Sequence, residues 1–375
     1  MKAKYIDSQA VEHIAIGASL LGTGGGGDPT IGKLLAQRAI AENGPVRLLD
    51  VTEVPDKEWI IPTAMMGAPL VMLEKIPSGE EPLRAFRDLE AILGRKAFAT
   101  MSLEAGGLNS TIPIFVAANM RIPLVDADGM GRAFPDIPMV TMTLHGISAT
   151  PMTMADEKGN TAVLHTIDNE WTEKLSRALT VQMGGSSLIA LYAMRGKEAK
   201  AAVIRHSISF EENLGRKLLE TRRSKTDPIE PILRATGGCL LFEGRIDDIQ
   251  RSVHRGFLFG EVTIAGLGNY RGETLKVEFQ NEHLVARQGA RVLASVPDLI
   301  CIVEKESAQP ITCESLKFGV HVMVIGMPCH RTWRSRAGVA LVGPRRFGYK
   351  FDYVPLERRA PSPHVAKRRN RRGRD

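Results

Sequence analysis

The sequence contains few of the features that identify membrane proteins, disulfide-bonded proteins or metal fingers. Its 375 residues include four cysteines (Cys239, Cys301, Cys313 and Cys329), and none is paired at the spacing of a metal finger or a redox motif. No apolar run is long enough to span a bilayer, and residues 1–13 have no apolar signal core. We therefore expect reduced, mostly buried thiols in a cytoplasmic protein without membrane contacts.

An excess of charge is also missing from most of the chain. The net charge is +7, and residues 358–375 account for all of it with eight Lys or Arg side chains and one acid, which leaves residues 1–357 neutral. This tail has little to bury, so we expect residues 357–375 to be disordered. Loose attachment to nucleic acid is one interpretation of the tail, and a solvated extension without a dedicated role is the other. The neutral body is not expected to bind nucleic acid.

The remaining composition is that of a globular protein, with 43% hydrophobic and 24% charged residues. In residues 1–166, predicted helices alternate with predicted strands at 46–51, 59–65, 97–101 and 122–125. This alternation predicts an α/β domain whose largely parallel sheet is flanked by helices.

The pattern of predicted secondary structure changes after this first domain. Residues 167–237 are predicted to form a helical connector packed on the α/β domain, with a long helix over 169–194 that is interrupted at 184–187. From residue 238 to 356, short strand-like runs separated by turn residues predict an antiparallel β-rich domain, either a barrel or a sandwich.

A glycine loop, GTGGGGDP, joins two predicted helices at residues 22–29. Gly24, Gly25, Gly26 and Gly27 leave backbone N–H groups uncovered, and Asp28 is predicted to cap the second helix. A glycine loop that leads into a helix N-terminus can bind an anion, so these five residues are candidates for substrate binding. A tight structural turn explains them equally well. A nucleotide site is disfavoured, because no strand precedes the loop and no Gly-Lys-Ser/Thr follows.

Two acids follow the predicted strand at 122–125. Asp126 and Asp128 project to the same side of an extended chain, and ligands of open α/β sheets bind beyond the carboxyl ends of the strands. Such a pair can share a proton and act as base and acid, or it can hold a divalent cation. An Asx turn between Asp128 and Gly129 is the structural alternative. We predict that Asp126 and Asp128 are catalytic.

Other candidates lie near these strand ends. Glu104 and Asn109 follow the strand at 97–101 and could form hydrogen bonds with a substrate. Arg132 could bind a carboxylate with two parallel hydrogen bonds, or it could be a surface or capping residue. His145 ends a predicted buried helix over 137–145, where it is either a structural residue or a proton donor. The sequence requires no cofactor, and whether these acids and a histidine bind a divalent metal stays open.

Several long stretches resemble the S-methyl-thiohydantoin desulfurase family. They include GASLLGTGGGGDP, MMGAPLVMLEK, LEAGGLNS, PLVDADGMGRAFPDIPM and GVHVMVIGMPCHRTWRSRAGVALVGPRRFGYKFDYVPL. The resemblance runs from about residue 7 to residue 356, so only the basic tail lies outside it. This family was long known as a domain of unknown function associated with hydantoinase-type genes. The resemblance implies an N-terminal α/β domain and a C-terminal β-rich domain, as the patterns above do.

The resemblance also implies a hydrolase that acts on a small molecule. Water would add to the ring carbon that bears the S-methyl group of a thiohydantoin with a carboxylated side chain, methanethiol would leave, and a hydantoin would remain. On this chemistry, Asp126 or Asp128 would be the base and the other acid or His145 the proton donor.

The remaining candidates would bind the substrate. Gly24–Gly27 and Arg132 would hold its carboxylate, and Glu104 and Asn109 would bind the ring N–H and C=O groups. A different interpretation of the whole chain is a non-catalytic accessory subunit that binds a hydantoinase-type or oxoprolinase-type partner. A homo-oligomer is compatible with both interpretations.

Overall fold

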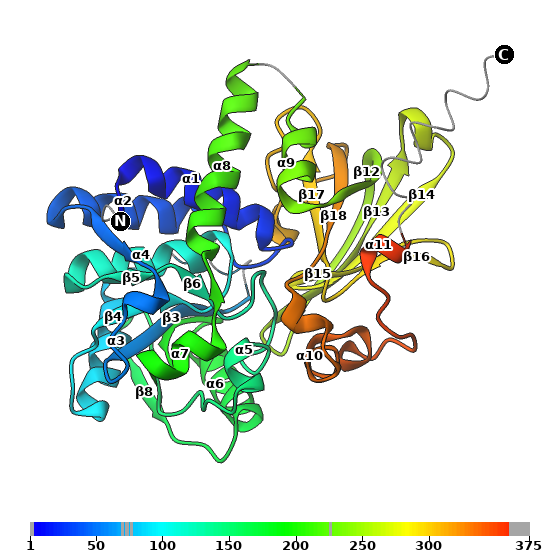
Figure 1. Cartoon of the computed structure of the whole chain (residues 1–375). Helices are drawn as coiled ribbons and strands as arrows, with labels where there is room; N and C mark the ends of the chain where they lie inside the picture. Colours follow the sequence, from blue (N-terminus) through cyan, green and yellow to red (C-terminus); the bar gives the residue numbers. More distant parts are fainter. Residues whose placement is uncertain (1–3, 69–70, 72–74, 76–77, 225–226, 360–375) are drawn as a thin grey trace.

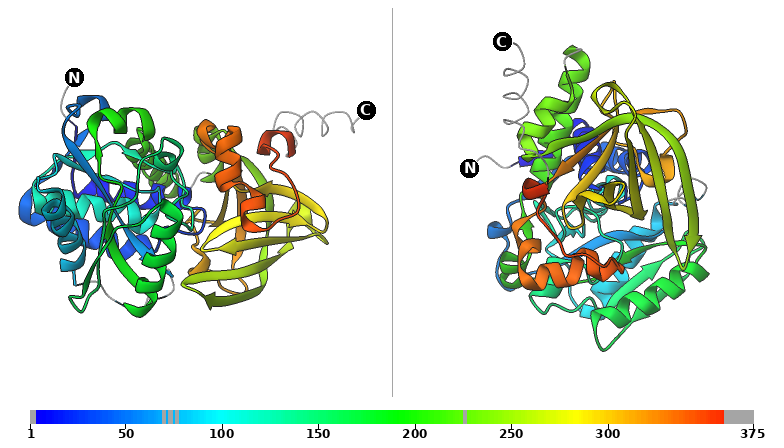
Figure 2. Two further views of the ribbon diagram at one scale, coloured as in Figure 1. Left: turned by 90° about the horizontal axis from the view of Figure 1, so that it is seen from below. Right: turned by 90° about the vertical axis from the view of Figure 1, so that its right-hand side faces the viewer.

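A nine-stranded mixed sheet with flanking helices forms the first part of the protein, and a seven-stranded antiparallel sheet forms the second part beside it (Figures 1 and 2). This is a computed structural model, which describes residues 4–359 apart from 69–70, 72–74, 76–77 and 225–226. The predicted fold class, an α/β region followed by an antiparallel β-rich region, is confirmed.

The first sheet is parallel only at its centre. Its order is β1-β2-β5-β4-β3-β9-β7-β8, with β10 beside β3. The pairs β2–β5, β5–β4 and β4–β3 are parallel, and the other pairs are antiparallel. The strands are β1 (Lys4–Ile6), β2 (Val46–Leu49), β3 (Trp59–Gly67), β4 (Ala99–Ser102), β5 (Leu124–Val125), β7 (Met152–Ala155), β8 (Thr161–Leu164), β9 (Ser186–Ala190) and β10 (Met194–Arg195). A separate antiparallel pair is formed by β6 (Ala127–Asp128) and β11 (Ile204–Arg205).

Helices cover both faces of this sheet, because its strands bury side chains on both sides. In β3, Ile60, Ala64 and Met66 belong to one apolar core, and Ile61 and Met65 belong to another. The second core is closed by α1 (Ser8–Leu21), α2 (Pro29–Asn43), α3 (Glu80–Leu93) and α4 (Gly107–Met120). On the opposite face lie α5 (Thr141–Leu144), α6 (Asn169–Gln182) and α7 (Gly196–Ala202).

Residues 167–237 combine helices with strands of the first sheet. The predicted long helix over 169–194 is wrong in its second half, because α6 ends at Gln182 and Ser186–Ala190 forms β9 between β3 and β7. A short, fully buried apolar run does not distinguish strand from helix by its periodicity. The helix α8 (Ser207–Ser224) packs closely on α1, and α9 (Ile229–Thr236) follows it.

The second sheet curls into a half-barrel (Figure 2). Its order is β16-β15-β14-β13-β12-β18-β17, and β15 also contacts β17 across the curl. The strands are β12 (Cys239–His254), β13 (Phe257–Gly266), β14 (Thr274–Gln280), β15 (Glu282–Gln288), β16 (Arg291–Ser295), β17 (Leu299–Glu304) and β18 (His321–Met327). Short helices complete the chain: η1 (Val51–Glu53), η3 (Gly268–Tyr270), η4 (Cys313–Ser315), η5 (Arg331–Arg334), α10 (Arg336–Val342), η6 (Pro344–Phe347) and α11 (Leu356–Arg359).

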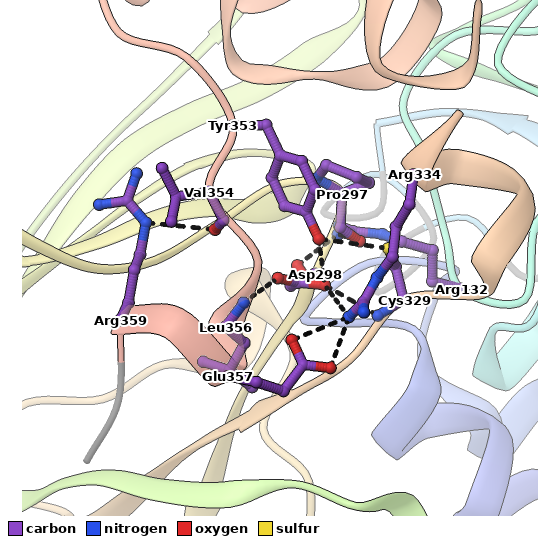
Figure 3. Close-up of polar contacts among 10 residues, drawn as sticks. All are labelled: Arg132, Pro297, Asp298, Cys329, Arg334, Tyr353, Val354, Leu356, Glu357 and Arg359. Carbon is purple, nitrogen blue, oxygen red and sulfur yellow. Dashed lines mark hydrogen bonds and ion pairs between the residues drawn. The ribbon is translucent and has the colours of Figure 1, made fainter. Parts of the chain in front are cut away.

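Asp298 fastens the C-terminal segment to the half-barrel (Figure 3). Its buried carboxylate accepts hydrogen bonds from the N–H of Cys329 (2.9 Å), the hydroxyl of Tyr353 (2.9 Å) and the N–H of Leu356 (2.8 Å). Arg334 lies 3.4 Å from the same carboxylate and also binds Glu357. These contacts fix the chain up to α11.

Three expectations concern the whole chain. The four cysteines are unpaired, and three of them are buried. In the part of the chain that the structure describes, no helix combines the length and the apolar character needed to cross a membrane. The tail predicted to be disordered, 357–375, lies outside the described residues except for 357–359, which belong to α11.

Candidate active site

A partly open pocket lies where the carboxyl ends of the parallel strands meet the half-barrel. Its polar lining comes from six places: the glycine loop, the segment after β4, the start of α4, the segment between β6 and α5, the face of α6 and the turn between β14 and β15. The lining residues are Gly26, Gly27, Ala64, Met65, Met66, Gly67, Leu103, Glu104, Asn109, Met130, Phe134, Pro135, Asp136, Ile137, Arg177, Ile189, Asn281 and Glu282.

The glycine loop contributes backbone to this pocket. Gly24, Gly26 and Gly27 have φ values of 87°, 71° and 76°, which disfavour residues with a Cβ. A Cβ on Gly26 would lie 2.4 Å from the Cα of Gly106, and a Cβ on Gly25 would lie 2.0 Å from Glu282 Oε1. Among the described residues, the N–H groups of Gly26 and Gly27 have no hydrogen-bond acceptor. The loop is therefore a tight structural turn that leaves two donors for a ligand.

Asp28 has a structural role in the same segment. Its carboxylate accepts a hydrogen bond from the N–H of Thr30 (2.7 Å) and caps α2, as the sequence predicts. It does not line the pocket.

Glu104 and Asn109 form a hydrogen-bonded unit in the pocket wall. The amide of Asn109 accepts from the N–H of Met65 (2.7 Å) and donates to Glu104 Oε1 (2.5 Å). The other carboxylate oxygen of Glu104 accepts from the N–H of Phe134 (3.3 Å). Burial raises the pKa of Glu104 to about 7, so this carboxyl gains and loses its proton near neutral pH.

A second buried carboxyl, Glu282, enters the pocket from the half-barrel. It follows Asn281, a turn residue with φ 56° whose side chain accepts from the N–H of Leu258 (2.9 Å). Within the described part of the chain, Glu282 Oε2 has no hydrogen-bond partner. Burial and then the charge of Glu104 raise the pKa of Glu282 well above its ordinary value. Glu104 and Glu282 therefore titrate together, and the pair retains a proton more readily than isolated glutamates do.

The pocket lining includes two further ionisable side chains, and each lies near a group of opposite charge: Asp136 near Arg346, and Arg177 near Glu173. Burial, and then the charge of Glu173, raise the pKa of Asp136 to about 7. Arg177 binds Glu173 (2.7 Å) and lies 4.0 Å from the ring centroid of Phe257. It also donates to the carbonyl of Pro135 (2.9 Å). The lining as a whole is acidic and offers hydrogen-bond acceptors to a ligand with N–H groups.

Asp126 and Asp128 are not in this pocket. The antiparallel pairing of β6 with β11 turns the chain after β5 away from the sheet edge and toward the start of α8. There, Asp126 accepts hydrogen bonds from the N–H (2.9 Å) and the hydroxyl (2.5 Å) of Ser209. Asp128 accepts from the N–H groups of Met130 and Gly131, which is the turn weighed as its structural alternative. Both acids thus have hydrogen-bond partners within the fold and lie outside the pocket lining, and their catalytic role stays a prediction.

Asp128 has an acidic neighbour in α8, and this has a consequence for stability. Glu211 is fully buried, and burial followed by the charge of Asp128 raises its pKa well above the usual value. Burial also raises the pKa of Asp128 to about 6. A carboxyl whose pKa is raised by folding favours the folded state while it is protonated, and this contribution is lost as the pH rises through its folded-state pKa.

Replacing Glu211 by Gln should therefore increase the free energy of unfolding at pH 8 by about 1–3 kcal/mol, with little change at pH 4.5. Urea denaturation at the two pH values measures this difference. The matched control is Glu212→Gln in the same helix, because Glu212 is partly exposed and paired with Lys4 (2.7 Å). A loss of stability at pH 8 for Glu211→Gln, beyond that of the control, would contradict the account of this acidic pair.

Arg132 is fully buried beneath the pocket and does not line it. Each of its five N–H donors has a protein acceptor: the carbonyls of Ala133, Pro297, Asp298 and His283 and the hydroxyl of Thr23, at 2.9–3.3 Å. No donor remains for a substrate carboxylate. Arg132 instead ties the glycine loop to the half-barrel.

His145 is exposed at the C-terminal end of α5 and does not line the pocket. The predicted helix over 137–145 is reduced to the four residues of α5, so the imidazole lies on the solvent side. Metal binding has no support from the geometry, because the described residues contain no cluster of three or more His, Cys, Asp or Glu side chains suited to a metal ion.

Comparison with known families covers nearly the whole chain. A model of the S-Me-THD-like N-terminal domain matches residues 9–166, and a model of the S-Me-THD-like C-terminal domain matches residues 167–356. The chain belongs to the S-Me-THD-like family. The resemblance to S-methyl-thiohydantoin desulfurases seen in the sequence is thereby confirmed.

The crystal structure of a protein from Chromobacterium violaceum has a fold similar to that of this S-Me-THD-like protein. The TM-score is 0.75 at 25% sequence identity, and the alignment covers 95% of this chain and 100% of that chain. None of the curated proteins matches the chain. The boundary between the two family domains lies just after β8, yet β9 and β10 belong to the first sheet, so both domains build that sheet.

Sequence reasoning found part of the pocket of this S-Me-THD-like protein and missed part. Gly26, Gly27, Glu104 and Asn109 were candidates and lie together. Four polar residues of the lining were not candidates: Asn281, Glu282, Asp136 and Arg177. The Gln-Asn-Glu turn between two predicted strands was a visible signal for Asn281, but nothing in the sequence places that turn beside the glycine loop.

Proposed function

We propose that this protein is a hydrolase that removes the S-methyl group of an S-methyl-thiohydantoin as methanethiol and leaves a hydantoin. Family membership supports the class of substrate. The observation that carries the reaction type is that two buried carboxyls, Glu104 and Glu282, line one pocket at the carboxyl edge of the sheet. Burial raises the pKa of both carboxyls, which favours a shared proton. Hydrolysis at this ring carbon requires one group that accepts a proton from water and one that donates a proton to the ring or to the leaving sulfur.

The surroundings of the two carboxyls differ, and the difference assigns their roles. Two N–H donors hold Glu104 in its charged form, so Glu104 is the base that deprotonates water. Glu282 has an oxygen without a partner among the described residues, so Glu282 carries the proton and is the acid. Glu104 takes one proton from water, the water oxygen bonds to the ring carbon, the carbon–sulfur bond breaks, and the thiolate leaves as methanethiol with the proton of Glu282. The second proton of the water moves from the new hydroxyl to the ring nitrogen, which gives the hydantoin, and Glu104 passes its proton to Glu282.

Backbone and amide groups would orient the ring. The N–H groups of Gly26 and Gly27 would donate to a ring oxygen as negative charge develops on it. A side-chain carboxylate of the substrate would not be held by Arg132, whose donors are all used, and would extend toward the open mouth of the pocket.

The test is an assay of the purified protein with S-methyl-thiohydantoins, in which free methanethiol and hydantoin are both measured. We expect the two products in equal amounts. We also expect kcat/KM to fall as the pH drops below about 7, because Glu104, the base, is then protonated. Rates no higher than those without protein across pH 5–9 would overturn the proposal. Turnover that appears only after a hydantoinase-type protein is added would support the accessory-subunit alternative.

A further inference from the structure

Large apolar side chains form an exposed stripe on α6. Ile167, just before the helix, is 87% exposed, Trp171 is 44% exposed and Leu175 is 42% exposed. Their spacing of four residues places them on one face of the helix. Soluble monomers rarely expose such a contiguous apolar surface, so this face is suited to a protein partner.

The neighbouring strand β8 adds an exposed apolar side chain next to this stripe. The strand β8 packs beside α6 and exposes Val163 (47%). It is the last strand of the sheet and pairs only with β7 within the described residues, so its outer edge is unpaired. The apolar row of α6 thus lies near an exposed valine on an edge strand, whose outer side is unpaired among the described residues.

The charged residues beside this apolar row indicate which kind of partner binds the face. Glu170 and Lys174 lie one turn apart along the same side of the apolar row. Lys174 Nζ is 4.9 Å from the ring centroid of Trp171, and Glu170 is bound by Arg346 (2.8 Å), so both charges are held close to the row. When two such helices meet antiparallel about a two-fold axis, each Lys174 faces the Glu170 of the other copy. An acid and a base spaced in this way are self-complementary.

We infer that this face binds a second copy of the chain, and that the protein is a two-fold dimer with α6 against α6. Trp171 lies beside the two-fold axis, near the centre of the contact, where an aromatic anchor contributes most to binding. The buried side of the same helix carries Arg177 of the pocket wall, so the dimer would support that wall from behind.

Sedimentation analysis of the full chain at micromolar concentrations tests this inference. We expect a dimer for the unaltered protein, and for Trp171→Glu a dissociation constant raised by about 30-fold or more. The matched control is Phe318→Glu, because Phe318 is an exposed apolar residue (70%) outside the stripe. The control should remain dimeric, and melting curves should show that both variants are folded.

Charge variants test the two-fold geometry itself. Lys174→Glu should weaken the dimer, because it places four acids at the contact, whereas Lys174→Ala, which adds no acid, should weaken it less. A monomer at every concentration, a dimer that Trp171→Glu leaves intact, or a Lys174→Glu dimer no weaker than that of Lys174→Ala would each overturn the inference. A heterologous partner on this face would appear as the first of these outcomes.

Discussion

Replacing Glu282 by Gln is expected to lower the rate of methanethiol release by about 10²–10⁴-fold, the usual contribution of a positioned acid or base. An amide has nearly the same shape as a carboxylic acid but cannot supply a proton. Glutamine is also uncharged, so it avoids the cost of burying a carboxylate, and the fold should persist. The rates of methanethiol release and the melting curve of the variant, measured side by side, separate loss of chemistry from loss of structure.

The matched control is Glu314→Gln. Glu314 is a second buried glutamate of the half-barrel region, and burial raises the pKa of its carboxyl to about 7, but it does not line the pocket. We expect the control to release methanethiol at close to the normal rate. A Glu282→Gln variant that is as active as the control would remove the acid from the mechanism.

Replacing Arg132 by Met is expected to lower the free energy of unfolding by about 3–5 kcal/mol. Methionine fills a similar volume, but it leaves four carbonyl oxygens and the hydroxyl of Thr23 without their donor in a buried place. The loss is large because the guanidinium binds Thr23 of the glycine loop. It also binds the carbonyls of Pro297 and Asp298 in the half-barrel (Figure 3), so both sides of the pocket depend on it.

Urea denaturation measures this loss, with Arg216→Met as the control. Arg216 is exposed on α8 and donates only to Asn213 among the described residues, so its replacement should change stability by no more than about 0.5 kcal/mol. A stable Arg132→Met protein with a raised KM for carboxylated substrates would instead support the substrate-binding role predicted from the sequence.

Local chemistry made much of the fold predictable. Asp28 and the following proline predict the start of α2 because an N-cap and a first-turn proline act within a few residues. Glu104 was found because it follows a buried strand whose end is marked by glycines. Asp126 and Asp128 were selected for the same reason, because they also follow a predicted buried strand and precede glycines. The pairing of β6 with β11 turns Asp126 and Asp128 away from the pocket that Glu104 lines. These two strands lie some 75 residues apart in the chain, so no local sequence pattern encodes the contact.

Glu282, the second acid of the pocket, could not be predicted from the sequence for a related reason. Glu282 begins a strand of the half-barrel, and its position beside Gly25 follows from how that sheet curls against the glycine loop. Arg132 shows a further limit, because a cation that follows a predicted strand suggests a ligand for a carboxylate. Backbone carbonyls from the half-barrel use its donors, and these become visible only in the folded protein.

One assay compares the two candidate acid pairs directly. Methanethiol release is measured for the double variant Glu104→Gln/Glu282→Gln and for the double variant Asp126→Asn/Asp128→Asn, in which the asparagine oxygen at position 128 can still accept the turn hydrogen bonds. We predict that the first variant releases no methanethiol above background and that the second, once shown to be folded, releases it at a rate close to that of the unaltered protein. An active first variant and an inactive, folded second variant would contradict the account.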